Sequence, residues 1–138
     1  MKKTLISFFC VLVILFMCLL RYPKLQEKRY YMETENFITE KVIVDNIIHN
    51  EQQGYIVFWL SEIDDSYQCP DFIIEGKNYS IVWENGIQRK LSIGDEITIT
   101  SAPKYFGNGD FMPIVSITIG DECLLSFDVG HKNLIEMY

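Results

Sequence analysis

The chain has few of the side chains on which most enzymes depend. It contains two histidines in 138 residues, and neither lies in a metal-ligand spacing or beside a recognisable nucleophile. No Cys-x-x-Cys pair is present, and no glycine-rich loop of the phosphate-binding type opens a helix. The sequence therefore predicts no catalytic residue, no metal site and no cofactor, and we expect a protein that is not an enzyme.

Positive charge is also scarce beyond the first part of the chain. From Glu40 onward there are six Lys and Arg residues against sixteen Asp and Glu residues, a formal charge of −10. A field of that sign repels phosphate backbones, so nucleic acid is excluded as a partner. It also disfavours docking of this region on anionic lipid. The negative charge is consistent with simple solubility, with binding of a divalent cation or with a cationic partner.

Alanine is nearly absent. Ala102 is the single alanine, whereas the chain has nineteen isoleucines. Alanine codons are rich in G and C and isoleucine codons in A and T, so the composition indicates an AT-rich bacterial source.

One long apolar run dominates the N-terminus. Residues 4–20 form seventeen positions without a charge, preceded by Lys2 and Lys3 and followed by Arg21-Tyr22-Pro23-Lys24. Such a run is stable in a lipid bilayer, where a helix satisfies its own backbone groups. Its end lacks the small residues that signal cleavage requires, so we expect a signal anchor over residues 1–21, with a cleaved signal and a secreted product as the alternative.

The orientation of this anchor follows less directly from charge. Four cations come after the run: Arg21, Lys24, Lys28 and Arg29. Because Lys2 and Lys3 are fewer, the positive-inside rule does not favour export. A lysine pair before an apolar run is nevertheless typical of export signals, and we expect a single-pass protein whose domain lies on the extracytoplasmic side of the cell membrane.

The rest of the chain divides into a short polar segment and one domain. Residues 22–39 show no clean helical stripe and are predicted to be a juxtamembrane stalk, and residues 40–138 are enough for one hydrophobic core. Short β-type runs separated by turn signals follow. The expected strands are 41–49, 55–62, 71–75, 79–84, 87–92, 96–101, 113–119 and 123–129.

Local patterns decide how these strands are arranged. Asn85-Gly86 predicts a tight hairpin between 79–84 and 87–92, because both turn residues must take positive φ. Apolar and polar residues alternate in most runs, which indicates antiparallel strands with one wet face. Residues 55–60 are apolar on both faces, so this strand is central or its outer face meets something. Since open sheet edges invite aggregation, we expect an all-β fold, a small antiparallel closed barrel.

The order of the long runs resembles the OB-fold, a five-stranded Greek-key barrel. The runs that carry the resemblance are 41–49, 55–62, 79–84, 96–101 and 113–119. The chain looks like the small signal-anchored OB-type domains of bacterial envelopes, over about residues 40–130 and at the level of architecture. The stretch 87–93, where many OB-folds place a helix, departs from the pattern and leaves other barrels or sandwiches open.

Aromatic residues supply the candidate binding positions. A loop with a glycine-rich tip carries Tyr105, Phe106, Asn108, Asp110 and Phe111, and the resemblance makes it the loop between the fourth and fifth strands, where OB-folds bind oligosaccharides or peptides. Aromatic faces beside Asn and Asp suit sugar rings or apolar side chains. The alternative is a hairpin whose aromatics pack on the barrel end. Two tryptophans complete the set: Trp59 and Trp83.

Two further groups have structural alternatives. Cys69 and Cys123 are the cysteines outside the apolar run, and a disulfide between them would stabilise a small domain in an oxidising compartment. They can equally be two unrelated thiols. Glu62, Asp64 and Asp65 form an acidic loop that offers oxygen ligands to Ca²⁺, but without EF-hand spacing, so a solvated turn is favoured.

These observations favour a membrane-anchored, extracytoplasmic module that acts through protein or glycan contact. A second hypothesis is an immunity- or inhibitor-like protein whose negative field neutralises a basic toxin or peptide. A third is a hydrolase with paired carboxylates, which requires a concave pocket holding two acids about 5–10 Å apart.

Overall fold

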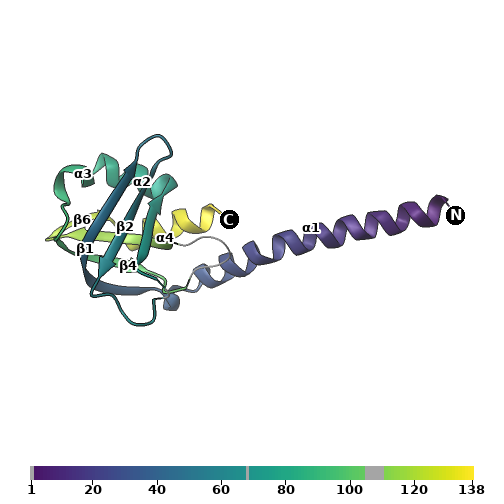
Figure 1. The fold of residues 1–138 in the computed structure, drawn as a ribbon, viewed down its shortest axis with the longest axis horizontal. Coiled ribbons are helices and arrows are strands. Elements are labelled where there is room, and N and C mark those ends of the chain that lie inside the picture. Colours follow the sequence, from purple (N-terminus) through teal and green to yellow (C-terminus); the bar gives the residue numbers. More distant parts are fainter. Residues whose placement is uncertain (1, 68, 105–110) are drawn as a thin grey trace.

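A long helix projects from a β-barrel in the computed structural model, which describes residues 2–67, 69–104 and 111–138, with side chains from residue 6 onward (Figure 1). The helices and strands, in chain order, are α1 (Lys2–Met32), a 3₁₀ turn η1 (Thr34–Asn36), β1 (Ile38–Asn50), β2 (Tyr55–Ser61), β3 (Asp71–Glu75), α2 (Gly76–Glu84), α3 (Ile87–Lys90), β4 (Glu96–Ser101), β5 (Met112–Ile119), β6 (Glu122–Leu125) and α4 (Phe127–Glu136).

Five strands close into a barrel. The sheet runs in the order β3-β2-β1-β4-β5-β6, and an additional parallel pairing of β3 with β5, through Phe72 and Met112, joins the two ends. The other pairings are antiparallel, and β6 extends the sheet beyond β5. The predicted closed barrel is therefore confirmed, with one closing pair that is parallel. The predicted apolar N-terminal helix is also present.

The expectation of an all-β fold is not confirmed, because helices make up 42% of the chain. Two segments predicted as strands, 79–84 and 87–92, lie largely in α2 and α3. In α2 the buried residues Asn78, Tyr79 and Val82 recur at helical spacing. Their β-branched and aromatic neighbours favour strands in isolation, but burial against the barrel decides the outcome.

Asn85-Gly86 forms a helix end instead of a hairpin. Gly86 takes a positive φ of 80°, whereas Asn85 keeps a φ of −77°, so the two-residue hairpin geometry is not met. The Gly86 N–H donates to Trp83 O and the Asn85 side chain donates to Leu124 O at 2.8 Å. Glycine at positive φ just after a helix is a common way for a helix to end.

The last predicted strand, 123–129, is half correct. β6 ends at Leu125, and α4 begins at Phe127 after the extended residue Ser126. Residues Gly130 and Leu134 are buried at helical spacing. Apolar residues occupy every second position of 123–129. This pattern did not distinguish the strand from the first turn of the helix that follows it.

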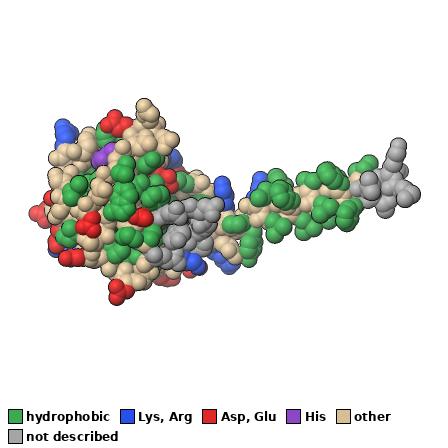
Figure 2. Space-filling model, in the orientation of Figure 1, with side chains coloured by type: hydrophobic (Ala, Val, Ile, Leu, Met, Phe, Trp, Pro, Cys, Tyr) green, Lys and Arg blue, Asp and Glu red, His purple; other side chains and the backbone are tan. Residues whose placement is uncertain are grey.

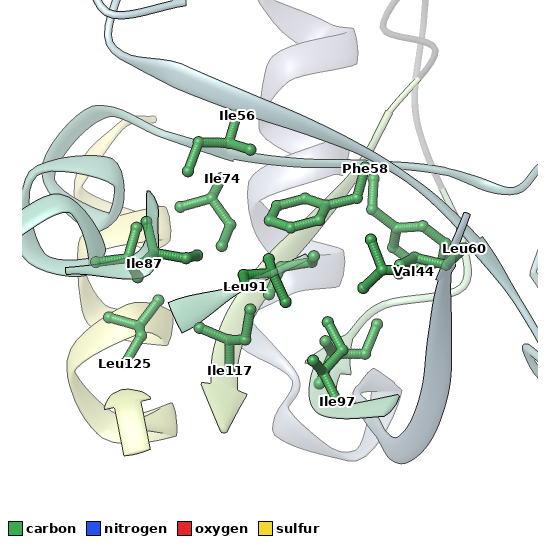
Figure 3. Packing of buried hydrophobic residues seen from close by; sticks show 14 of the residues in the cluster. Val44, Ile56, Phe58, Leu60, Ile74, Ile87, Leu91, Ile97, Ile117 and Leu125 are labelled. Carbon is green, nitrogen blue, oxygen red and sulfur yellow. The ribbon is translucent and has the colours of Figure 1, made fainter. Parts of the chain in front are cut away.

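The barrel interior is filled by aliphatic and aromatic side chains from every strand. Figure 3 shows Ile56, Phe58 and Leu60 of β2 pointing toward residues of the opposite wall, such as Ile97 and Ile117. Burial of each such side chain stabilises the fold by about 1.5–3 kcal/mol relative to exposure. This core holds the strands in register and so fixes which residues point outward.

α1 continues past the apolar run and joins the barrel directly. It passes through Pro23 without ending and reaches Met32, where Tyr31 is only 2% exposed. The stalk predicted for 22–39 is thus helical over much of its length. Tyr31 belongs to a second cluster on the outside of the barrel, whose buried members are Tyr31, Ala102, Val115 and Leu134.

α4 lies against the outer side of β5 and completes this cluster. A Cβ placed on Gly130 would lie 1.9 Å from the carbonyl oxygen of Val115, so only glycine permits so close an approach. Asn78 of α2 donates to Gly130 O at 2.9 Å, and Asn133 donates to Asn78 Oδ1 at 2.9 Å. These contacts connect α4, α2 and β5.

Candidate interaction surface

The outer face of β2 carries apolar side chains. Alternation along β2 sends Ile56, Phe58 and Leu60 inward, so Val57 and Trp59 point outward. Val57 is nevertheless only 5% exposed and Trp59 is half-buried. Other outward side chains lie beside them in the sheet.

Register shows which side chains these are. Val57 is opposite Ile48 of β1 on one side and Ile73 of β3 on the other, and Ile73 is opposite Pro113 of β5. Paired residues point to the same face of a sheet. One apolar row thus crosses four strands, from Ile48, which is 47% exposed, to the half-buried Pro113.

A second row lies beside the first. Trp59 is opposite Asn46 of β1 and Asp71 of β3. Met112 is fully buried, so Phe111 emerges on the same outer side as Pro113, and it is 37% exposed. Figure 2 shows hydrophobic side chains gathered on the barrel face that includes β2, in the view of Figure 1. We call this surface the Trp59 face; its members are Asn46, Ile48, Val57, Trp59, Asp71, Ile73, Phe111 and Pro113.

Asp71 is the polar group of chemical interest on this face. Its Oδ1 atom is buried and, among the described residues, has no hydrogen-bond partner. A buried oxygen without a donor costs about 1–3 kcal/mol.

The structure brings together only part of the predicted binding set. Trp59 and Phe111 lie on the same face, whereas Trp83 belongs to α2 and packs partly buried against the core. Trp83 stacks on Tyr79 with ring centroids 5.7 Å apart and meets His49 edge-on at 5.9 Å. Burial lowers the pKa of His49 below its ordinary value. This aromatic group closes the end of the barrel near the β1–β2 loop.

Four predicted residues, Tyr105, Phe106, Asn108 and Asp110, lie outside the described residues, and their binding role stays a prediction. Sequence reasoning missed Asp71, Ile73 and Ile48 as members of a surface. The signal was present for Ile48, since Ile47-Ile48 places apolar residues on both faces of β1. It was absent for Asp71, whose position depends on pairing across three strands.

The possible disulfide is not formed. Within the described part of the chain, no bond joins Cys69 to Cys123. Cys69 precedes β3, packs against the core and has its Sγ 3.9 Å from Asp71 O. Cys123 is exposed on β6. The alternative of two unrelated thiols therefore describes this structure.

The acidic loop satisfies its own polar groups. Asp64 Oδ1 accepts hydrogen bonds from Ser66 N at 2.8 Å and Ser66 Oγ at 2.5 Å. These bonds lower the pKa of the Asp64 carboxyl below its ordinary value. Over residues 2–67, 69–104 and 111–138, no group of three His, Cys, Asp or Glu side chains could hold a metal ion. The loop has the features of a solvated turn.

Three grooves lined by described residues run along α1. Glu33 is the one carboxylate side chain that lines any of these three grooves. The concave site with two acids that a hydrolase requires is not found among them. Comparisons with protein-family models, curated proteins and solved structures find no match to this chain.

Proposed function

We propose that this chain is a membrane-anchored binding module that holds a polypeptide partner on the Trp59 face. The observation that carries the proposal is the half-buried Trp59 beside the apolar row of Ile48, Ile73 and Pro113 on the outer face of the sheet. Tryptophan is among the residues most often responsible for binding energy at protein interfaces. The exposed Ile48 and the half-buried Ile73 supply the apolar centre that such interfaces have.

The anchor is α1. It is the one helix, within the described residues, long and apolar enough to span a membrane, and a secretion signal would have the same properties. We propose that the helix stays attached and that the barrel lies on the extracytoplasmic side of a bacterial membrane. The lack of small residues at the end of the apolar run supports retention.

The arrangement of the barrel supports the same surface. Its strands follow the order β1-β2-β3-β5-β4, with α2 between β3 and β4. This is the arrangement expected of an OB-fold, and such folds bind through the face of strands 2 and 3 and the adjoining loops. We therefore propose an OB-like barrel that uses the corresponding face.

A basic partner is favoured within this proposal. The formal charge of −10 from Glu40 onward attracts cations, and Asp71 can accept from a lysine or arginine side chain. This agrees with the immunity- or inhibitor-like hypothesis. A glycan would use Trp59 and Asp71 equally well, but it would gain less from the aliphatic row.

Site-specific photocrosslinking tests the surface. A benzoyl-phenylalanine at position 59 or 73 of the full chain, in cells that produce it naturally, should give an adduct in which mass spectrometry identifies peptides of a second protein. The same group at the exposed Gln88 of α3 is the matched control and should give none. Adduct yield should fall steeply with ionic strength if the partner is basic.

Other results would change the proposal. An adduct that contains no peptides of a second protein and loses its added mass on periodate oxidation would assign the face to a glycan. A flat response to salt would remove the basic partner. Equal adducts from positions 59, 73 and 88, or none, would contradict the Trp59 face as a binding surface.

A further inference from the structure

A stripe of cations lies on α1 where its apolar part ends. Arg21, Lys24 and Lys28 follow one another at spacings of three and four residues, so they share one side of the helix. Figure 2 shows Lys and Arg side chains at the junction between the helix and the domain. The barrel itself is acidic, whereas these cations lie on the helix, outside the barrel.

The cations line a groove that the chain does not fill. Arg21, Lys24, Leu25 and Lys28, together with Tyr138 at the end of α4, surround a shallow space of about 310 Å³. A second groove, of about 530 Å³, continues from it along the apolar part of α1. Its lining is Val13, Ile14, Met17, Cys18, Arg21, Tyr22 and Leu25. Arg21 and Leu25 line both, so a cationic groove is continuous with an apolar one.

Charges within the chain leave the stripe available. The ion pairs formed among described residues are Lys41–Glu96, Lys77–Glu136 and Lys90–Glu122, and no cation of the stripe takes part in them. The nearest acid on the same helix, Glu27, accepts a hydrogen bond from the Tyr138 hydroxyl at 2.5 Å. Glu27 is thus held by the C-terminal tyrosine and leaves three cations for an external anion.

We propose that this double groove binds one anionic phospholipid, with the headgroup phosphate between Arg21, Lys24 and Lys28 and an acyl chain along Val13–Cys18. The inference rests on the proposed membrane anchoring of α1. Phosphate oxygens accept hydrogen bonds from arginine and lysine, and each such cation near a membrane surface adds to the affinity for anionic lipid. A free phosphate would have no use for the adjoining apolar groove, so a lipid is the occupant.

The same arrangement separates the barrel from the lipid surface. Twelve residues of helix from Arg21 to Met32 span about 18 Å at 1.5 Å per residue. Anionic lipid attracts the stripe and repels the acidic barrel, so the two regions act in opposite directions on the position of the domain. The lipid would hold the base of the helix while the Trp59 face stays accessible.

Lipid retention by the full chain tests the proposal. The protein is placed in bilayers of phosphatidylcholine with 30% phosphatidylglycerol, extracted in mild detergent, and its bound lipids are identified by native mass spectrometry. We expect enrichment of phosphatidylglycerol over its share of the bilayer. The triple variant Arg21→Gln, Lys24→Gln, Lys28→Gln should lose this enrichment about tenfold or more.

A matched control separates the stripe from net charge. The variant Lys41→Gln, Arg89→Gln, Lys132→Gln removes the same charge from the barrel and should retain the lipid. Loss of lipid in both variants, or in neither, would overturn the proposal, as would displacement by inorganic phosphate at equal concentration. Anchoring is read separately: a full chain released from membranes by alkaline carbonate contradicts the anchor, whereas an anchored chain without lipid preference contradicts only the lipid site.

Discussion

Nε2 of His131 lies 2.6 Å from the backbone carbonyl oxygen of Tyr31, although the two residues are 100 positions apart. A carbonyl oxygen can only accept, so the ring nitrogen donates the hydrogen. The His131 ring also stacks on Phe127 and meets Phe37 edge-on, each with centroids 5.2 Å apart. This histidine therefore connects the end of the N-terminal helix to the last helix of the domain.

We expect His131→Ala to lower the free energy of unfolding of the barrel by about 1–3 kcal/mol, since a hydrogen bond and two ring contacts are lost. Urea unfolding of the full chain in detergent micelles, followed by tryptophan fluorescence, measures this. His131→Phe keeps the ring contacts, so its free energy of unfolding should lie between those of His131→Ala and the parent protein. If His131→Phe is as damaging as His131→Ala, the hydrogen bond is the dominant contact.

Gly130→Ala should be strongly destabilising, by about 2 kcal/mol or more, because the added Cβ would meet Val115 O at 1.9 Å. In an exposed helix the same change is favourable by up to about 1 kcal/mol, so the sign itself tests the packing. Lys132→Ala, at an exposed position of the same helix, serves as the control and should be neutral. A stable Gly130→Ala variant would show that α4 does not lie as close to β5 as described here.

Asp71→Ala should leave the free energy of unfolding unchanged or raise it, because it removes a buried oxygen that has no donor among the described residues. At the same time it should reduce photocrosslinking from position 59. Stability and binding would thus respond in opposite directions, which is typical of functional positions. A clear loss of stability would mean that Asp71 has a structural role.

Glu40→Gln should change how stability depends on pH. Burial raises the pKa of the Glu40 carboxyl above its ordinary value of 4.5, although the N–H of Asp64, which donates to Oε2 at 3.0 Å, opposes this. A raised pKa contributes stability that is present below pH 4.5 and is lost as the pH rises through the folded-state value.

The difference in unfolding free energy between Glu40→Gln and the parent should therefore move in favour of the variant from about pH 4.5 upward. Chemical unfolding at a series of pH values provides the measurement. Glutamine still accepts from the Asp64 N–H, so the local hydrogen bond is kept. A difference that does not vary between pH 4 and 7 would contradict the assignment.

The barrel could be predicted because its strands follow a pattern that local chemistry imposes. Alternation in 96–101 and 113–119 and the doubly apolar run 55–60 place the strands, and the need to remove sheet edges predicts closure. The parallel pairing of β3 with β5 was not predictable in this way, since it depends on which strands meet when the sheet curls.

The helices were missed for a related reason. Tyr79, Val82 and Trp83 are residues with strand propensity, and only their burial against the barrel end makes them helical. Trp59 could be identified from composition, but the Trp59 face could not, because Ile48, Asp71 and Pro113 join it through register over 65 positions of sequence, from Ile48 to Pro113. Local patterns identify elements, whereas a surface emerges from their pairing.

Because α1 is continuous from its apolar part to the buried Tyr31, no loop separates the apolar part of the helix from the barrel. In the anchored state, any tilt that the bilayer imposes on the helix turns the whole domain by the same angle. Hydrophobic thickness sets such tilts, so a thicker or thinner membrane would point the Trp59 face in a different direction. The lipid environment would then select which neighbouring proteins the domain can reach.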